Sequence, residues 1–228
     1  LCSVRIEACR FKPYRPYHRG YVVRQGQLTL PRPQKVNMKI HNNVLKDEEH
    51  KALVRYVTSN GFTWNYNDAT DRPGAMNDTP QMVRALMARA SLEDWQEEPS
   101  HYTSQHFYHK YFWQIPYLHD ILKNCGSTGE YWRVKLNLLQ PYHNAPEHHP
   151  FHVDIEQHGW QAPGGFTSYV YYINDSDGDT WFEDGTRHTP KANTAIEFDS
   201  SIKHASSNPT KGPRYVINFI TTNTPLRI

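Results

Sequence analysis

Short segments in which apolar and polar residues alternate follow one another along the second half of the chain, beyond Glu130. Alternation with a period of two gives a β-strand one apolar and one polar face, and strands at this spacing, separated by turn residues, are typical of β-barrels and sandwiches. The segments with this pattern are 131–139, 150–156, 166–174, 179–185, 193–199 and 214–222. We therefore expect a β-barrel core over residues 131–228.

The region between residues 38 and 130 mixes helix and strand patterns, so we expect it to support one face of the barrel. Leu53, Tyr56 and Val57 fall on one stripe of a helix, and Thr79 followed by Pro80 is typical of a helix N-terminus. Helices are predicted at 47–60, after Pro80 (with Met82, Val83, Leu86 and Met87 on one face) and at 116–126, and strands at 38–45, 61–67 and 101–113.

Residues 1–37 differ in charge from the rest of the chain. They hold eight Lys and Arg against one acidic residue, a net charge of +7, whereas residues 38–228 hold 17 Lys and Arg against 22 Asp and Glu, a net charge of −5. The first methionine is Met38, where the periodic pattern also begins. We interpret residues 1–37 as a poorly structured or appended leader, and 38–228 as a single domain. The alternative is a functional basic arm that binds nucleic acid or a membrane surface.

Composition excludes several classes of protein. No apolar run approaches the roughly 20 residues that span a bilayer, so an integral membrane protein is not expected. The chain is 13% aromatic, which argues against intrinsic disorder. Its three cysteines, Cys2, Cys9 and Cys125, are too few and too scattered for a disulfide framework, which favours a reducing compartment and a cytoplasmic location.

The segment FHVDIE carries the most informative pair of polar residues, His152 and Asp154. Two residues apart on a strand, their side chains project from the same face. Histidine with carboxylate suits a divalent ion such as Fe(II), and one more ligand completes a facial triad. The chain has 14 His, so a His-x-Asp pair alone also arises by chance.

Two later residues extend the pattern. His204 follows a predicted strand, and Arg214 begins the last one, ten residues further on. Arg214, Val216 and Asn218 alternate onto one face of that strand, and a lone cation on a barrel-lining face needs an anion. A guanidinium binds a carboxylate through two parallel hydrogen bonds and stays charged in a dry pocket. The alternative is an ordinary surface arginine.

This ordered set resembles the Fe(II)- and 2-oxoglutarate-dependent dioxygenases, in particular their prolyl 4-hydroxylase-like branch. The resemblance runs from about Met38 to Thr222. It is strongest in RVKLNLLQPY, HVD, YVYYINDSDGDTWFEDG, FDSSIKHASSNP and RYVINF. It implies a mostly β, α+β fold: a double-stranded β-helix, or cupin-like jelly-roll barrel, braced by N-terminal helices.

The resemblance also implies roles for individual residues. It makes His152, Asp154 and His204 the catalytic metal ligands, and it sets Arg214 against the distal carboxylate of 2-oxoglutarate. Tyr172 corresponds to a tyrosine whose hydroxyl reaches the same carboxylate, with core packing as the alternative. Tyr142 is expected near the cosubstrate, and Asn218 is expected to add a polar contact there.

The function that follows is hydroxylation of an unactivated C–H bond, with Fe(II) as cofactor, 2-oxoglutarate and O2 as cosubstrates, and succinate and CO2 as products. A prolyl residue in a protein or peptide is the first substrate to expect, and a small molecule is the second. No nucleic-acid or membrane partner is expected, because the body of the chain is acidic. A nucleic-acid substrate, or a cupin-like binding module without catalysis, remains the alternative.

Overall fold

A computed structural model describes residues 35–68, 70, 78–88, 107–108, 112, 114–155 and 165–223. The predicted leader up to residue 34 and most of the predicted strand 101–113 lie outside these residues. At the edge of the leader, Val36 and Met38 pack against the barrel core, and the Val36 amide donates to Asp184 Oδ2 at 2.9 Å. Contact with the barrel therefore begins before Met38.

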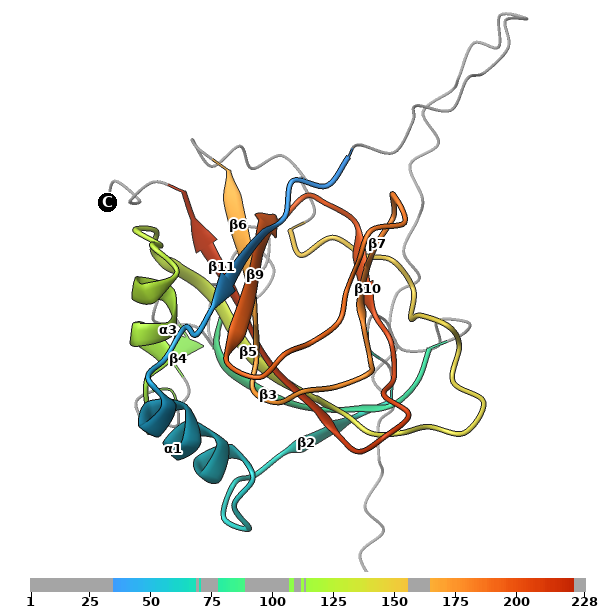
Figure 1. Ribbon diagram of the computed structural model, residues 1–228, viewed down its shortest axis with the longest axis horizontal. Coiled ribbons are helices and arrows are strands. Elements are labelled where there is room, and N and C mark those ends of the chain that lie inside the picture. The colour runs from blue at the N-terminus through green and yellow to red at the C-terminus, as the bar shows by residue number, and fades with distance from the viewer. Residues whose placement is uncertain are drawn as a thin grey trace, which may run out of the picture. The chain divides into compact units, whose positions relative to one another are not determined.

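Eight of the described strands form one antiparallel sheet, which we call the major sheet (Figure 1). Their order is β1-β9-β6-β11-β5-β3-β2, and β4 pairs with β3. The bounds are β1 Lys39–Asn42, β2 Asn65–Asn67, β3 Gln81–Ala88, β4 Phe107–Tyr108, β5 Tyr131–Leu139, β6 Phe166–Tyr172, β9 Thr194–Asp199 and β11 Arg214–Thr222. The centre of this sheet is β11, which pairs with β6 on one side and β5 on the other.

Three short strands form a second sheet, the minor sheet, that faces the major one in Figure 1. They are β7 (Thr180–Phe182), β8 (Arg187–His188) and β10 (His204–Ser206), in the order β10-β7-β8. Buried apolar side chains fill part of the space between the sheets. They are Val170, Tyr172, Phe182, Ile196, Phe198 and Val216. Two antiparallel sheets around one interior make up the expected barrel.

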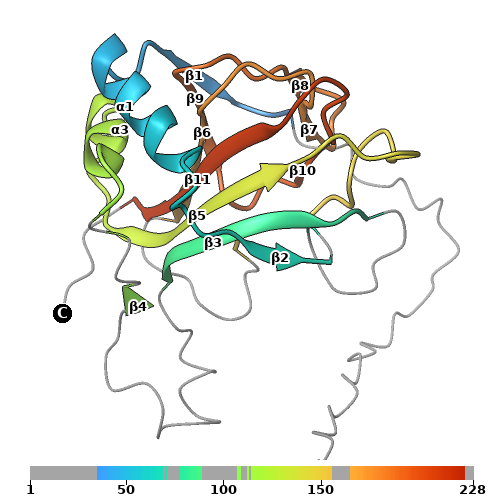
Figure 2. The same ribbon diagram turned by 90° about the horizontal axis from the view of Figure 1, so that it is seen from below.

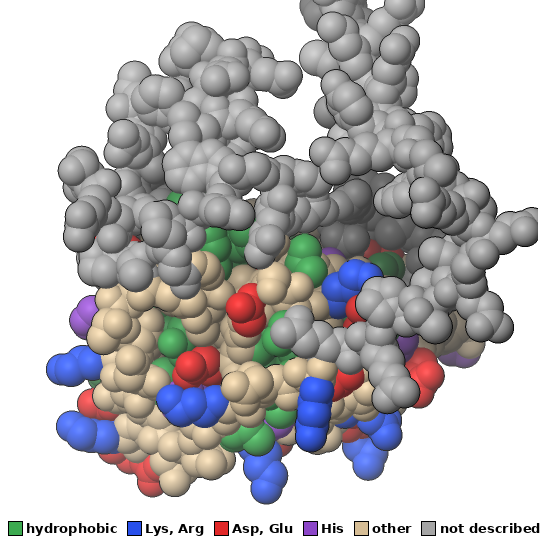
Figure 3. Space-filling view, turned by 90° about the horizontal axis from the view of Figure 1, so that it is seen from above, with side chains coloured by type: hydrophobic (Ala, Val, Ile, Leu, Met, Phe, Trp, Pro, Cys, Tyr) green, Lys and Arg blue, Asp and Glu red, His purple; other side chains and the backbone are tan. Residues whose placement is uncertain are grey.

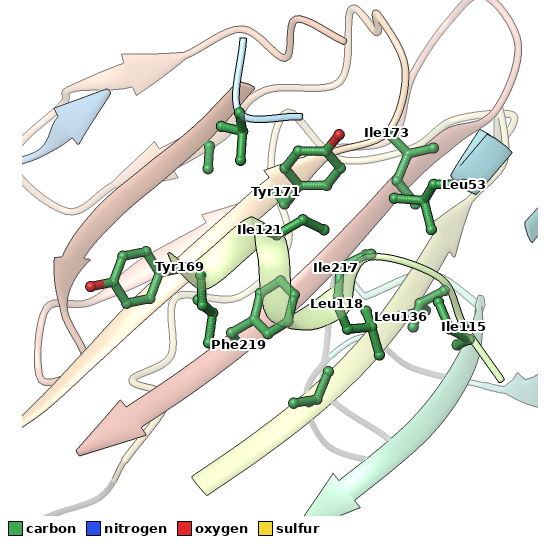
Figure 4. Packing of buried hydrophobic residues seen from close by; sticks show 14 of the residues in the cluster. Leu53, Ile115, Leu118, Ile121, Leu136, Tyr169, Tyr171, Ile173, Ile217 and Phe219 are labelled. Atoms are coloured by element: carbon green, nitrogen blue, oxygen red, sulfur yellow. The ribbon is translucent and has the colours of Figure 1, made fainter. Parts of the chain in front are cut away.

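Two helices cover the outer face of the major sheet, α1 (Asp47–Val57) and α3 (Leu118–Asn124). Figures 1 and 2 both show them on the side away from the minor sheet. Figure 4 shows Leu53 of α1 and Ile121 of α3 packed against outward-facing residues of β5, β6 and β11, such as Leu136, Tyr171 and Ile217. The predicted mostly β fold with flanking helices is confirmed.

Two sequence-based predictions of secondary structure are wrong. The segment after Pro80 is strand β3 and not a helix, because it pairs with β2 and β5. Residues 150–156 form no regular strand, since the described part of that segment has a single bridge, between His152 and His204. Helix α1 also ends at Val57, three residues earlier than predicted.

Charged side chains of both signs are interspersed over the described part of the surface in Figure 3. A uniformly basic field, which a nucleic-acid backbone requires, is not visible among the described residues of that face. None of the helices within the described ranges is long and apolar enough to cross a bilayer.

Candidate metal centre and anion pocket

Three side chains converge where the 152–154 segment lies against the minor sheet. His152 and His204 exchange two backbone hydrogen bonds of 2.9 Å, and the Asp154 amide donates to the Ser200 carbonyl at 3.1 Å. The ligand atoms of His152, Asp154 and His204 all lie within 4.8 Å of one another. Although 152–154 is no regular strand, its side chains thus meet at one point, as the His-x-Asp spacing predicts.

Backbone carbonyls orient both imidazole rings. His204 Nδ1 donates to the Ile202 carbonyl at 3.0 Å, and His152 Nδ1 lies 3.5 Å from the Pro150 carbonyl. With its proton on Nδ1, each ring turns the lone pair of Nε2 to the shared point, and His204 Nε2 is 3.6 Å from Asp154 Oδ2. Nε2 is therefore the atom of each ring that would face a metal ion.

The protonation states of the buried groups also suit a cation. Burial, helped by the neighbouring His204, lowers the pKa of His152 to about 4, so its ring is neutral at pH 7. Burial by itself raises the pKa of the Asp154 carboxyl, but His204, Arg133 and Ser168 together hold it well below its usual range. A neutral His152 ring and the Asp154 carboxylate, together with the His204 imidazole, fit a divalent ion such as Fe(II).

A buried arginine lies on the inner face of β11. Arg214 is 3% exposed, and its Nη2 donates to Thr180 Oγ1 at 2.9 Å. Its Nε is buried without a hydrogen-bond partner, and no ion pair joins Arg214 to a carboxylate among the described residues. Burial lowers the pKa of Arg214, and the charge of Asp179 opposes that shift without forming an ion pair. A buried guanidinium without a direct ion pair is costly, so this position fits an anionic ligand.

Tyr172 lies beside Arg214 in the buried interior between the two sheets. Its hydroxyl lies 2.8 Å from Thr180 Oγ1, the same hydroxyl that Arg214 contacts, and its ring stacks on His188 with centroids 5.2 Å apart. Burial raises the pKa of Tyr172 to about 12, so the hydroxyl stays a neutral donor. The structure thus places Tyr172 beside Arg214 with Thr180 between them, and a contact of its hydroxyl with the cosubstrate stays a prediction.

One cavity joins the metal-ligand triad to Arg214. Its lining includes Asn218 of β11 and Thr180 of β7. Among the described residues, Asn218 Oδ1 and Asn137 Oδ1 are buried without hydrogen-bond partners. Unsatisfied polar atoms in a cavity indicate a polar ligand, because each costs free energy while it lacks a partner.

The sequence analysis missed the contribution of β5 to this cavity. Arg133, Lys135 and Asn137 all line it. They alternate along β5, whose bounds match the predicted strand 131–139. Buried Val134 and Leu136 lie on the other face of the same strand. A polar stripe on the inward face of a barrel strand is the pattern by which they could have been recognised.

Tyr142 does not line this cavity. Its side chain is 51% exposed and lies in a separate groove on the outside, beside Trp181 and Pro209. The structure thus places Tyr142 apart from the cavity that holds the triad and Arg214.

Neither a protein family model nor a curated protein sequence matches the chain.

Solved structures, in contrast, do match the chain. An oxidoreductase of the 2OG-Fe(II) oxygenase family from Burkholderia pseudomallei is 14% identical, over 82% of this chain and 85% of that one, with a TM-score of 0.53. The non-heme alpha ketoglutarate dependent epimerase SnoN of nogalamycin biosynthesis is 13% identical, over 82% and 77%, with a TM-score of 0.51. A Pseudomonas putida prolyl-4-hydroxylase is 15% identical, over 83% and 94%, with a TM-score of 0.45. The chain therefore has the double-stranded β-helix fold that the 2-oxoglutarate- and Fe(II)-dependent oxygenases share.

Proposed function

We propose that this protein is an Fe(II)- and 2-oxoglutarate-dependent dioxygenase that hydroxylates an unactivated C–H bond. The observation that carries the proposal is the pairing, in one cavity, of a His-Asp-His triad with a buried guanidinium that has no carboxylate partner among the described residues. A ligand with a metal-chelating end and a distal carboxylate satisfies both, and 2-oxoglutarate has that chemistry.

His152, Asp154 and His204 would hold the metal. When bound, Fe(II) supplies open coordination positions at which O2 oxidises 2-oxoglutarate to succinate and CO2, and one oxygen atom goes to the substrate C–H bond. These three residues would leave the remaining coordination positions of the ion to ligands that enter from the cavity.

Arg214 would bind the distal carboxylate of 2-oxoglutarate, with Thr180 and Tyr172 fixing the guanidinium. Its unpaired Nε then gains an acceptor. Because the pocket is buried, the charge-assisted hydrogen bonds are stronger than they are in water. Asn218 and Asn137 line the same cavity and offer polar contacts to this ligand.

A prolyl residue in a protein or peptide is the substrate that we propose to test first. Its support is the motif resemblance, from RVKLNLLQPY to RYVINF. Fold likeness does not select a substrate, so a small molecule is the second class to test.

The test is release of succinate from 2-oxoglutarate by the purified protein, with and without Fe(II). Wild-type protein should form succinate only with Fe(II), and Asp154→Ala should form none, while Tyr142→Ala, outside the cavity, serves as the matched control. A peptide library with oxidation read as a mass increase then identifies the substrate. If the protein is folded but does not bind 2-oxoglutarate, a cupin-like binding module is favoured instead.

A further inference from the structure

Both oxygens of the Asp154 carboxylate already have hydrogen-bond donors. Arg133 Nη2 forms a short ion pair with Oδ1, and Ser168 Oγ donates to Oδ2 at 2.6 Å. Ser168 is in turn 2.8 Å from Ser200 Oγ. Residues from β5, β6 and the turn after β9 thus fix one side chain of the triad.

Arg133 is the nearest cation to this carboxylate. The Asp154 side chain is 5% exposed, and a carboxylate at such depth needs a counter-charge. The Arg133 guanidinium supplies that counter-charge. It does so from the cavity, since Arg133 lines the same space as the triad.

A divalent ion at the triad would share Asp154 with this guanidinium. Two cations on one carboxylate repel each other, and in a partly buried site this repulsion is poorly screened. The Arg133 contact therefore stabilises the site without metal and opposes the entry of metal.

We propose that Arg133 is a positioning residue that acts as the resident counter-ion of Asp154: it holds the carboxylate in its ligand geometry when no metal is bound, and it weakens divalent-metal binding. This inference rests on the metal site of the proposed function. It goes beyond that function because it assigns a second role to the cavity, the control of metal affinity and exchange.

A thermodynamic cycle between residue 133 and the metal tests the proposal. Co(II), which does not oxidise readily in air, is titrated calorimetrically into wild-type protein, Arg133→Gln and Arg133→Lys. Lys51→Gln, which breaks the exposed Lys51–Glu48 pair on α1, is the control for loss of a surface charge. Denaturant unfolding of each protein is measured with EDTA and with saturating Co(II).

Arg133→Gln should bind Co(II) about tenfold tighter or more, because the competing charge is gone. It should be less stable than wild type in EDTA and should recover most of that loss with Co(II). Arg133→Lys keeps the charge and should stay within about threefold of the wild-type Kd. If Arg133→Gln folds only with Co(II), that result also supports the proposal.

A merely structural role predicts something else, namely the same loss of stability with and without Co(II). That result, or an unchanged or weaker Co(II) affinity in Arg133→Gln, would overturn the inference and leave the proposed metal site intact. Absence of Co(II) binding in both wild type and Arg133→Gln would overturn the metal site itself, and the inference with it.

Discussion

The guanidinium carbon of Arg214 lies 5.7 Å from the centre of the Tyr172 ring, and both side chains contact the hydroxyl of Thr180. The groups in direct contact with the Arg214 guanidinium here are neutral, and the charge of Asp179 acts on it without an ion pair, so a ligand carboxylate can still bind it directly. Three residues from β11, β6 and β7 meet here, so both sheets of the barrel contribute to the pocket.

Replacing Arg214 tests that pocket directly. A charge-assisted contact with a carboxylate contributes roughly 1.5–3 kcal/mol, so Arg214→Ala should raise the 2-oxoglutarate concentration for half-maximal succinate formation about ten- to a hundredfold. Arg214→Lys should be intermediate, because the charge remains but the two-pronged geometry does not. Tyr172→Phe should cost about three- to tenfold, as one neutral hydrogen bond is lost. Normal binding of 2-oxoglutarate by Arg214→Ala would remove the cosubstrate site from the proposal.

Tyr142 should be dispensable for 2-oxoglutarate binding. Its ring is half exposed in a groove outside the barrel, and it does not line the cavity that joins the triad to Arg214. Tyr142→Ala should therefore change the 2-oxoglutarate requirement by less than about twofold. A tenfold rise in the same succinate assay would instead mean that the loop closes over the cavity when the cosubstrate binds.

Gly178 is required by a close approach of two chain segments beside Arg214. A Cβ at this position would lie 2.6 Å from the Ser207 carbonyl oxygen, 2.9 Å from Pro209 N and 3.1 Å from Arg214 Cδ. Backbone atoms cannot move away cheaply, so Gly178→Ala should destabilise the fold by about 1–3 kcal/mol and weaken 2-oxoglutarate binding by displacing Arg214.

Gly61→Ala is the matched control, because a Cβ there meets nothing within 4 Å. It should change the free energy of unfolding by no more than about 0.5 kcal/mol and leave binding unchanged. Denaturant unfolding and calorimetry with 2-oxoglutarate measure both quantities. Equal stability of the two variants would show that the 176–179 turn relaxes without strain.

The sequence predicts the fold best where each strand has one clear pattern. β5 and β11 have the predicted bounds, because polar and apolar positions alternate along them and turns flank them. Strand β3 was predicted as a helix because its apolar residues include neighbours, Met82 and Val83. A strand covered on both faces also carries apolar residues on both, so periodicity alone does not distinguish it from a helix.

The site is predictable to the extent that it consists of a motif. His152, Asp154 and His204 converge, and Arg214 and Asn218 line the same cavity. Arg133 was missed because its role comes from a contact with Asp154 across 21 positions of sequence. The sequence could not place the Tyr142 side chain, because a loop has no period that fixes which side chains face inward.

Acid should weaken the fold through His149, which is 1% exposed on the inner side of the 140–150 loop. Its Nε2 donates to Asn208 Oδ1 at 2.8 Å, and its Nδ1 accepts from Ser206 Oγ at 2.9 Å. Burial lowers the pKa of His149, although the bond to Asn208 opposes the shift. Below its ordinary pKa of about 6.5, the unfolded chain therefore binds a proton here that the folded chain does not.

The sign of the effect follows from proton linkage: where the unfolded state binds more protons, the free energy of unfolding falls as the pH falls. The contribution of His149 should be complete above about pH 6.5 and be lost progressively as the pH drops toward the folded-state pKa. His149→Gln keeps a polar group near Asn208 and Ser206 but removes the titration, so its stability should fall less steeply between about pH 8 and pH 5. Denaturant unfolding in EDTA measures this slope without any metal contribution.

His143→Gln, at an exposed position of the same loop, should keep the wild-type slope. If His149→Gln also keeps it, another buried group controls the acid sensitivity of the fold.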